Sequence, residues 1–371
     1  MLIYLITIFS AYFIFLIILI VGWQKALSIK QGEPWQDFVS VIVAARNEET
    51  AISLLIKSLS KQTYPKNKFE IILVNDHSTD LTEVEILKLI DRYPDLSIIK
   101  KNSFGEGKKK AITTGVEAAK GKIILTTDAD CTLPVDWIFS MSKPFKQKTH
   151  MVIGAVKIST NKTFFSEIQA LEFSSVMGSG IAMLGWNKPV MCNGASLAFR
   201  KEAFFKVGGY EGNFQIPSGD DEFLMRKIIE RFPNSVRFAA SLGCVVETTP
   251  QNSMQDFSQQ RLRWAGKWKA NDSTFAKFVA LFVLIVQVSW LFSIGYLIFN
   301  PSSIGIFPII ALKIGLEFIF LWLVSRYLRQ RFNLLAFFTL QLLYPVYAIV
   351  IGLLSQIKSY SWKDRTASFS R

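Results

Sequence analysis

The sequence predicts an α/β domain held between membrane-spanning helices. Two observations carry this prediction: strand and helix patterns alternate through the polar middle of the chain, and long apolar runs flank that middle on both sides. Alternating strands and helices are typical of a mostly parallel sheet covered on both faces by helices. We expect the domain over residues 36–270, a transmembrane helix over residues 1–22, three more over residues 278–354, and a basic tail over residues 355–371.

The alternation begins with a short β-branched run that is followed by apolar residues at helical spacing, and the same order then repeats. A domain of this length is large enough to bury one core. The predicted elements are strands over Phe38 to Ala45, Phe69 to Val74, Leu96 to Ile99 and Lys122 to Thr127, with helices over Ile52 to Leu59, over Thr82 to Arg92 and from Lys108.

The ends of the chain predict a membrane protein. Leu2 to Val21 is apolar and carries no charge, and its length matches the ~30 Å hydrocarbon layer crossed by a helix. Three further apolar runs of similar length follow the polar middle of the chain: Phe278 to Phe299, Ser303 to Val324 and Asn333 to Leu354. No Lys or Arg precedes the first run and no small-residue cleavage site follows it, which favours an anchor over a cleaved signal peptide. We expect an integral protein of the cell inner membrane.

Basic residues beside the spans predict the orientation, because Lys and Arg are retained on the cytoplasmic side. Lys25 and Lys30 follow the first run, and five more basic residues precede the second, so the domain is predicted to be cytoplasmic. An odd number of C-terminal spans would export the basic tail. Either the rule fails there, or one run does not span. The third run is the suspect, because Lys313 and Glu317 lie in its middle, where the pair either neutralises itself or lines a polar path.

The net charge of +13 raises the possibility of nucleic-acid binding. The basic residues are dispersed or gathered beside the spans, where anionic head groups attract them, so membrane lipids are the expected partner and nucleic acid is not. Cys131, Cys192 and Cys244 have no metal-like spacing, and we expect reduced, packed thiols.

Acidic side chains follow three predicted strands at the point where each ends. Glu48 follows the first strand, Asp76 the second, and Asp128 and Asp130 the strand that ends at Thr127. Ligands bind beyond the carboxyl ends of strands in open parallel sheets. Each acid alone could be an ordinary turn or cap residue, but three strand ends directed toward one crevice favour a binding site.

Two further patterns suggest specific chemistry. The spacing of Asp128 and Asp130 on an extended segment turns both carboxylates to one side, and oxygen ligands suit Mg²⁺ or Mn²⁺. In QQRLRW, Arg263 offers a planar fork suited to phosphate, Gln260 adds amide hydrogen bonds, and Trp264 offers a face for stacking. An interfacial helix, with Trp264 and Trp268 at i,i+4 spacing, is the alternative for this segment.

The set of motifs VNDHSTD, TTDADC, SGDDEF and QQRLRW resembles glycosyltransferase family 2, in its membrane-bound branch with cellulose, hyaluronan and poly-N-acetylglucosamine synthases. The resemblance covers roughly Val39 to Trp268. It implies a GT-A type, Rossmann-like fold and transfer of a sugar from a nucleotide diphosphate with inversion at the anomeric carbon. A divalent cation would then bridge the carboxylates to the diphosphate.

The resemblance also assigns the donor-binding residues. It implies that Asp130 binds the metal, that Asp128 binds the metal or the nucleotide, and that Glu48 and Asp76 contact the nucleoside. Lys108 would touch the donor, in a match to a Gly-Lys-x-x-Ala motif. The run from Lys108 to Lys110, taken alone, is equally a phosphate site or a solvated helix start.

The acceptor side is assigned in the same way. Asp221 would be the catalytic base; the family motif is usually Glu-Asp, and here it is Asp220-Asp221. An acidic helix start favoured by the helix dipole is compatible with that role. Asn193 would border the acceptor, and QQRLRW would close over the diphosphate with Trp264 at the acceptor end.

The resemblance leaves three functions open. One is a processive synthase that extends a β-linked polysaccharide from a UDP-sugar, with an export partner or self-association completing its channel. Another adds one sugar to a polyprenyl phosphate or glycolipid. The third is a nucleotide-binding scaffold without activity, against which Asp221 and Asp130 argue. The apolar stretch from Phe164 to Met183 is either a core helix or lies against the membrane.

Overall fold

The computed structural model describes residues 2–29, 32–33, 35, 37–266, 273–357, 360–363 and 365–367. The chain divides into two compact units. The sheet unit comprises Lys25–Ser159 and Met183–Thr249, and the helical unit comprises Met1–Gln24, Thr160–Ala182 and Pro250–Arg371. Each unit is built from segments that are distant in sequence.

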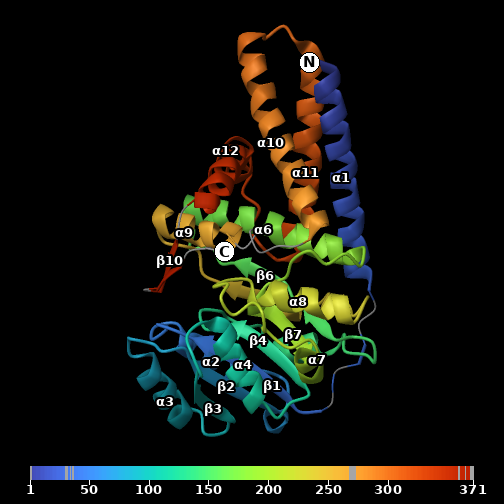
Figure 1. The fold of residues 1–371 in the computed structure, drawn as a ribbon. Helices are drawn as coiled ribbons and strands as arrows, with labels where there is room; N and C mark the ends of the chain where they lie inside the picture. Colours follow the sequence, from blue (N-terminus) through green and yellow to red (C-terminus); the bar gives the residue numbers. More distant parts are fainter. Residues whose placement is uncertain are drawn as a thin grey trace. The chain divides into compact units, whose positions relative to one another are not determined.

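A seven-stranded sheet in the order β3-β2-β1-β4-β7-β5-β8 forms the centre of the sheet unit (Figure 1). The pairs among β1, β2, β3 and β4 are parallel, whereas β7 pairs antiparallel with both β4 and β5. The mostly parallel sheet predicted from the sequence is confirmed. The strands are β1 Val39–Ala45, β2 Phe69–Asn75, β3 Ile98–Asn102, β4 Ile123–Asp128, β5 Met151–Ile153, β7 Leu197–Arg200 and β8 Val236–Phe238.

The central strands are buried because helices cover the sheet. Every residue of β2 is buried, as expected of a parallel strand that is covered on both faces. Gly115 of α4 lies so close to β1 that a Cβ there would be 2.5 Å from Ile42 Cγ2. The helices of this unit are α2 Ile52–Ser60, α3 Thr82–Arg92, α4 Lys108–Ala118, α5 Trp137–Ser142, α7 Lys201–Lys206 and α8 Asp220–Arg231.

Two short strands form a second sheet, in which β6 Val156–Ile158 pairs in parallel with β9 Val246–Thr248. The predicted strand over Leu96 to Ile99 is displaced in the structure. The amide of Leu96 donates to the carbonyl of Tyr93 in a turn, and β3 begins only at Ile98. The predicted C-terminal bound was too early because the last residues of β3, including Lys100 and Lys101, are polar and do not show the apolar pattern of a buried strand.

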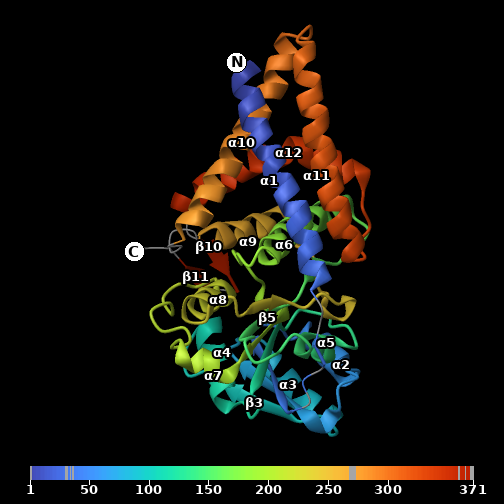
Figure 2. The ribbon, with the colours of Figure 1, turned by 90° about the vertical axis from the view of Figure 1, so that its right-hand side faces the viewer.

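Helices make up most of the helical unit, in which α1, α10 and α11 run beside one another (Figures 1 and 2). Within the part of the chain that the structure describes, four helices are long and apolar enough to cross a membrane, in the segments predicted from the sequence. The elements are α1 Leu2–Ser28, α6 Phe164–Gly185, α9 Met254–Gly266, α10 Thr274–Phe299, α11 Phe307–Tyr327, α12 Leu334–Ile357, β10 Tyr360–Trp362 and β11 Arg365–Ala367.

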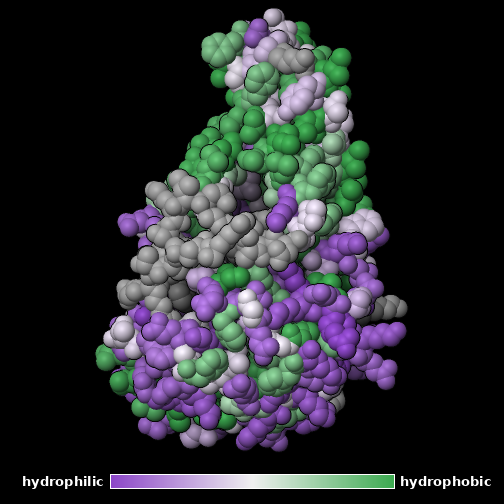
Figure 3. Space-filling view, viewed as in Figure 1, coloured by the Kyte–Doolittle hydropathy of each residue, from purple (hydrophilic) through white to green (hydrophobic). Residues whose placement is uncertain are grey.

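The surface of the long helices is strongly apolar, whereas the sheet unit is mainly hydrophilic on the face shown in Figure 3. Large apolar side chains along α1 and α10 are exposed, including Ile14, Phe278 and Phe292. An exposed apolar surface of this kind is suited to lipid. Part of the predicted basic tail, including Lys358 and Arg371, lies outside the described residues, as do Lys30 and Trp268.

The charged pair in the middle of α11 is neutralised inside the helical unit. Lys313 Nζ donates to Glu317 Oε2 at 3.0 Å and to Gln341 Oε1 at 2.6 Å. Tyr12 of α1 donates its hydroxyl to Glu317 Oε1 at 2.6 Å, and Lys313 lies 4.1 Å from the ring centroid of Trp290. The pair therefore links four helices, which is the first of the two alternatives raised by the sequence.

Candidate functional site

The carboxyl ends of β1, β2 and β4 lie at one edge of the sheet. Ala45 pairs with Asn75, and Ala44 pairs with Asp128, so the residues that follow these strands emerge side by side. Asp76 and Asp128 are thereby brought to the same edge, as the sequence predicted from the strand ends.

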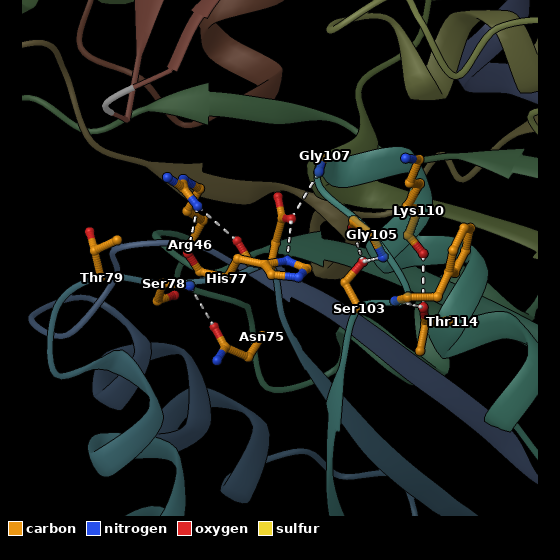
Figure 4. Close-up of polar contacts among 12 residues, drawn as sticks. Arg46, Asn75, His77, Ser78, Thr79, Ser103, Gly105, Gly107, Lys110 and Thr114 are labelled. Atoms are coloured by element: carbon orange, nitrogen blue, oxygen red, sulfur yellow. Dashed lines mark hydrogen bonds and ion pairs between the residues drawn. The ribbon is translucent and has the colours of Figure 1, made fainter.

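Asp76 is 2% exposed and holds the loop before α4. Its Oδ1 accepts a hydrogen bond of 2.8 Å from the amide of Gly107, whose φ of 105° is in the region that favours glycine. Arg46 Nη1 donates to the carbonyl oxygens of Asp76 and His77 at 3.1 and 2.5 Å (Figure 4). The turn role of Asp76 is thus visible in the structure, and its contact with a nucleoside stays a prediction.

Glu48 is half-buried and begins the connection from β1 to α2. Its amide donates to Thr82 Oγ1 at 2.7 Å, and its carbonyl accepts from the amides of Ala51 and Ile52. The backbone of Glu48 therefore ties the end of β1 to the starts of α2 and α3. Its predicted contact with the nucleoside is not tested by this geometry.

Lys108, the first residue of α4, joins two acidic segments. Its Nζ donates to Asp128 Oδ1 at 2.6 Å and lies 3.4 Å from Asp220 Oδ2. Burial acts to lower the pKa of Lys108, but Asp128 and Asp220 outweigh burial and raise the pKa above its ordinary value. Lys108 is therefore a fixed cation between the end of β4 and the start of α8.

Asp221 lies in the first turn of α8 with both carboxylate oxygens in use. Its Oδ2 accepts from the amide of Gly194 at 3.0 Å, and its Oδ1 accepts from the amide of Glu222 at 2.7 Å. Thr126 of β4 donates to the carbonyl of Gly194 at 2.9 Å. The structure therefore brings together Asp128, Lys108 and Asp221, which are separated by up to 113 residues in sequence.

The segment that begins at Asn193 packs directly against these acids. A Cβ at Gly194 would lie 3.3 Å from both Asp220 Oδ2 and Lys108 Nζ, so a side chain there would crowd the ion pair. Asn193 uses its own Oδ1 to accept a hydrogen bond of 2.9 Å from the amide of Ala195. Asn193 is thus close to the predicted base, and its contact with an acceptor remains a prediction.

Lys109 is a site residue that the sequence reasoning missed. It is 4% exposed, and its Nζ donates to the carbonyls of Asn213, Ile216 and Ser218 at 2.8, 2.6 and 3.1 Å. Burial lowers its pKa to about 8, against the opposing effect of Asp220 and Asp221. Lys109 therefore fixes the loop that leads into α8. Its place in the run KKK gave the only hint, because carbonyl acceptors leave no pattern in sequence.

Asp130 is exposed beyond the end of β4, next to the buried Cys131. Burial, with the nearby charges of Asp130 and Asp128, raises the pKa of the Cys131 thiol well above its ordinary value. Cys192 and Cys244 are also buried, as expected of packed thiols.

The donor set at this edge fits a hard divalent cation that also binds a phosphate ligand. Within the described residues, no cluster of three or more His, Cys, Asp or Glu side chains forms a complete metal cage. Mg²⁺ is commonly held by one or two carboxylates together with substrate phosphates and water. Asp128 ends β4, and Asp130 lies in the turn that follows rather than on the extended segment predicted from the sequence. Both carboxylates are of the kind that Mg²⁺ prefers, and their role as its ligands stays a prediction.

The motif QQRLRW lies on α9 in the helical unit, whereas the acids belong to the sheet unit. Arg261 and Leu262 are buried, and Gln260, Arg263 and Trp264 are half-buried. The segment is helical, as the interfacial-helix alternative required, and the three predicted binding residues retain partial exposure.

Comparison with known proteins gives consistent matches. Residues 40–208 match the family described as "Glycosyl transferase family 2". The "Probable glycosyltransferase YdaM" of Bacillus subtilis is 26% identical over 71% of this chain and 62% of that protein. The "Poly-beta-1,6-N-acetyl-D-glucosamine synthase" of Staphylococcus epidermidis is 23% identical over 80% of this chain and 73% of that protein.

A "Beta-monoglucosyldiacylglycerol synthase" of Nostoc sp. is 29% identical over 37% of this chain and 30% of that protein. The match thus spans less than two thirds of the Bacillus and Nostoc relatives. A solved structure, "Mannosyltransferase PcManGT from Pyrobaculum calidifontis in complex with GDP-Man and Mn2+", covers 96% of this chain and 99% of its own, with a TM-score of 0.58 and 17% identity. This likeness confirms the predicted GT-A type fold.

Proposed function

Residues 40–208 of this chain form a glycosyltransferase family 2 domain, and we propose that the enzyme uses a UDP-sugar to extend a β-linked polysaccharide at the membrane. One observation carries the proposal: Asp128, Lys108 and Asp221 lie close together. In this proposal Asp128 binds the metal, Lys108 is a fixed cation, and Asp221 takes the proton. A nucleotide-binding scaffold would not need the last of these.

Asp221 is the proposed base. Attack of an acceptor hydroxyl on the anomeric carbon requires a group that takes its proton, and a carboxylate placed beside that hydroxyl serves this role. The amides of Gly194 and Glu222 hold both oxygens of Asp221 in place. The transferred proton would move from the hydroxyl to Asp221 while the nucleoside diphosphate leaves.

Asp130 and Asp128 are the residues proposed to hold Mg²⁺ or Mn²⁺. When bound, such a cation neutralises the charge that develops on the diphosphate leaving group. Lys108 then offers a second positive charge near the same group, since it already lies against Asp128 and Asp220. Glu48 and Asp76 would contact the nucleoside, and Asn193 the acceptor.

The motif on α9 is proposed to act at the diphosphate and the acceptor. Gln260 and Arg263 supply donors for phosphate oxygens, and Trp264 supplies an aromatic face on which a terminal sugar stacks. An aromatic face accepts the sugar in several registers, which suits repeated extension.

The polymer product is supported by the extent of the alignments. The Staphylococcus relative, which is named a polysaccharide synthase, aligns over 80% of this chain, whereas the Nostoc relative, named for a glycolipid product, aligns over only 37%. Addition of one sugar to a polyprenyl phosphate or glycolipid is the second candidate, because that glycolipid relative shares the domain. An export partner or self-association would complete a channel for a polymer.

Product length separates the two candidates. Limiting enzyme with excess UDP-sugar should give long products early and few short intermediates, and Trp264→Ala should reduce both rate and product length. A product that stops at one added sugar and requires supplied lipid would favour the glycolipid alternative and contradict the polymer assignment.

The catalytic domain is proposed to lie on the cytoplasmic side, where nucleotide sugars are available, with the four apolar helices in the inner membrane. If all three C-terminal helices span, reporters fused after Arg371 and inserted between Asn300 and Ser303 should both be non-cytoplasmic. Reporters on opposite sides would mean that one of the last two helices does not cross.

A further inference from the structure

The helix α9 buries the two residues that lie between the proposed binding residues of its motif. Leu262 packs against α12, and Arg261 is 3% exposed. Gln260, Arg263 and Trp264 remain half-buried. The intervening residues therefore anchor the helix, and the flanking residues keep partial exposure.

Arg261 is held by an ion pair inside the helical unit. Its Nε donates to Glu172 Oε1 at 3.3 Å, and its Nη2 pairs with the second oxygen of the same carboxylate. Glu172 lies on α6 and is only 5% exposed. A bidentate ion pair of this kind fixes the plane of the guanidinium. Removing one partner would leave a buried charge unpaired, which is strongly unfavourable. The orientation of Arg261 is thus set by α6.

The same guanidinium contacts two of the proposed binding residues. Its Nη1 donates to Gln260 Oε1, and its Cζ lies 4.3 Å from the ring centroid of Trp264 and 4.4 Å from that of Phe257. Phe173, the residue after Glu172, packs on Trp264 with ring centroids 5.7 Å apart. Consecutive residues of α6 therefore hold Arg261 and Trp264 together.

We propose that Arg261, fixed by Glu172, is a positioning residue that orients Gln260 and Trp264 for the diphosphate of the donor and for the acceptor sugar. The proposal rests on the function proposed above for QQRLRW. Arg261 donates to the Gln260 amide oxygen through Nη1 and lies over the ring of Trp264 with its guanidinium. A lysine cannot make both contacts, because its ammonium is a point charge without a planar fork. The pair also makes α6 a support of the proposed donor-binding motif.

The test is titration of UDP with Mn²⁺ into the detergent-solubilised full chain, with thermal denaturation measured in parallel. Arg261→Lys keeps the charge and loses the fork, so we expect UDP binding at least tenfold weaker and a melting temperature within a few degrees of wild type. Glu172→Gln should weaken UDP binding similarly and also lower the melting temperature. The matched control is Glu317→Gln, which breaks the buried pair with Lys313 in the same unit and should lower the melting temperature without changing UDP binding.

Two results would overturn the inference. One is UDP binding within twofold of wild type in both Arg261→Lys and Glu172→Gln. The other is equal weakening in Glu317→Gln, because the effect would then follow stability rather than position. Wild type that does not bind UDP would contradict the proposed function, and this inference with it, before any variant is compared.

Discussion

Replacement of Asp221 by asparagine should stop transfer and leave nucleotide binding almost unchanged. The two oxygens of Asp221 accept hydrogen bonds from two amides, those of Gly194 and Glu222. Asparagine has one oxygen and one NH₂ group, so in either orientation one of those amides loses its acceptor. An unsatisfied donor costs ~1–3 kcal/mol, which a folded domain tolerates.

The kinetic effect should be much larger than the structural one. A positioned general base contributes ~10²–10⁴ in rate, which corresponds to ~3–5 kcal/mol of barrier at 1.36 kcal/mol for each factor of ten. Loss of the base raises the barrier without removing nucleotide contacts. We therefore expect at least a hundredfold fall in kcat, with UDP affinity within a few-fold of wild type.

The assay is release of UDP from a UDP-sugar under saturating donor, with UDP affinity measured separately by titration. Glu222→Gln is the matched control, because it also removes a negative charge from the first turn of α8 and breaks the pair with Arg226. This control should lose stability and keep kcat within about tenfold. Transfer by Asp221→Asn within tenfold of wild type would refute the assignment of the base.

Three other outcomes are expected. Asp130→Ala should weaken UDP binding when Mn²⁺ or Mg²⁺ is present and match wild type in excess chelator; activity that persists in chelator would exclude the metal role. Lys109 has a folded-state pKa of about 8 against an ordinary value of 10.5. Below pH 8 Lys109 is charged in both the folded and the unfolded chain, and between pH 8 and 10.5 only the unfolded chain keeps the proton. The free energy of unfolding should therefore rise with pH over this range, by at most ~3 kcal/mol for a pKa difference of 2.5 at 1.36 kcal/mol per pKa unit. Melting curves of wild type and Lys109→Met that stay parallel over that range would contradict this. Lys313→Met should leave Glu317 buried without its cation and lower stability by ~3–5 kcal/mol with no change in UDP affinity, and an unchanged melting temperature would show that the pair does not support the bundle.

The parallel part of the fold was predictable because its pattern is local. Buried parallel strands read as continuous β-branched runs, as in FVSVIVAA and FEIILV, and α3 spans the predicted Thr82 to Arg92. The antiparallel strand β7 was not predicted. Its position between β4 and β5 depends on a chain reversal through α6, which leaves no periodic pattern.

The acids of the site were predictable for a related reason. Parallel strands end at the same edge, so residues that follow β1, β2 and β4 must meet. The partners of those acids were not predictable. Lys109 binds three carbonyls, Asp221 accepts from Gly194, and Glu172 pairs with Arg261 across 89 residues. Each contact depends on tertiary placement of groups that are ordinary in sequence.

The most direct test of the proposed function is mass analysis of the product formed by the purified full chain from a panel of UDP-sugars with Mn²⁺ or Mg²⁺ and membrane lipid. The proposal predicts that one UDP-sugar is consumed, that UDP is released, and that the product is a saccharide series spaced by the mass of one sugar residue. A panel in which no UDP-sugar is consumed, although UDP binds, would contradict it.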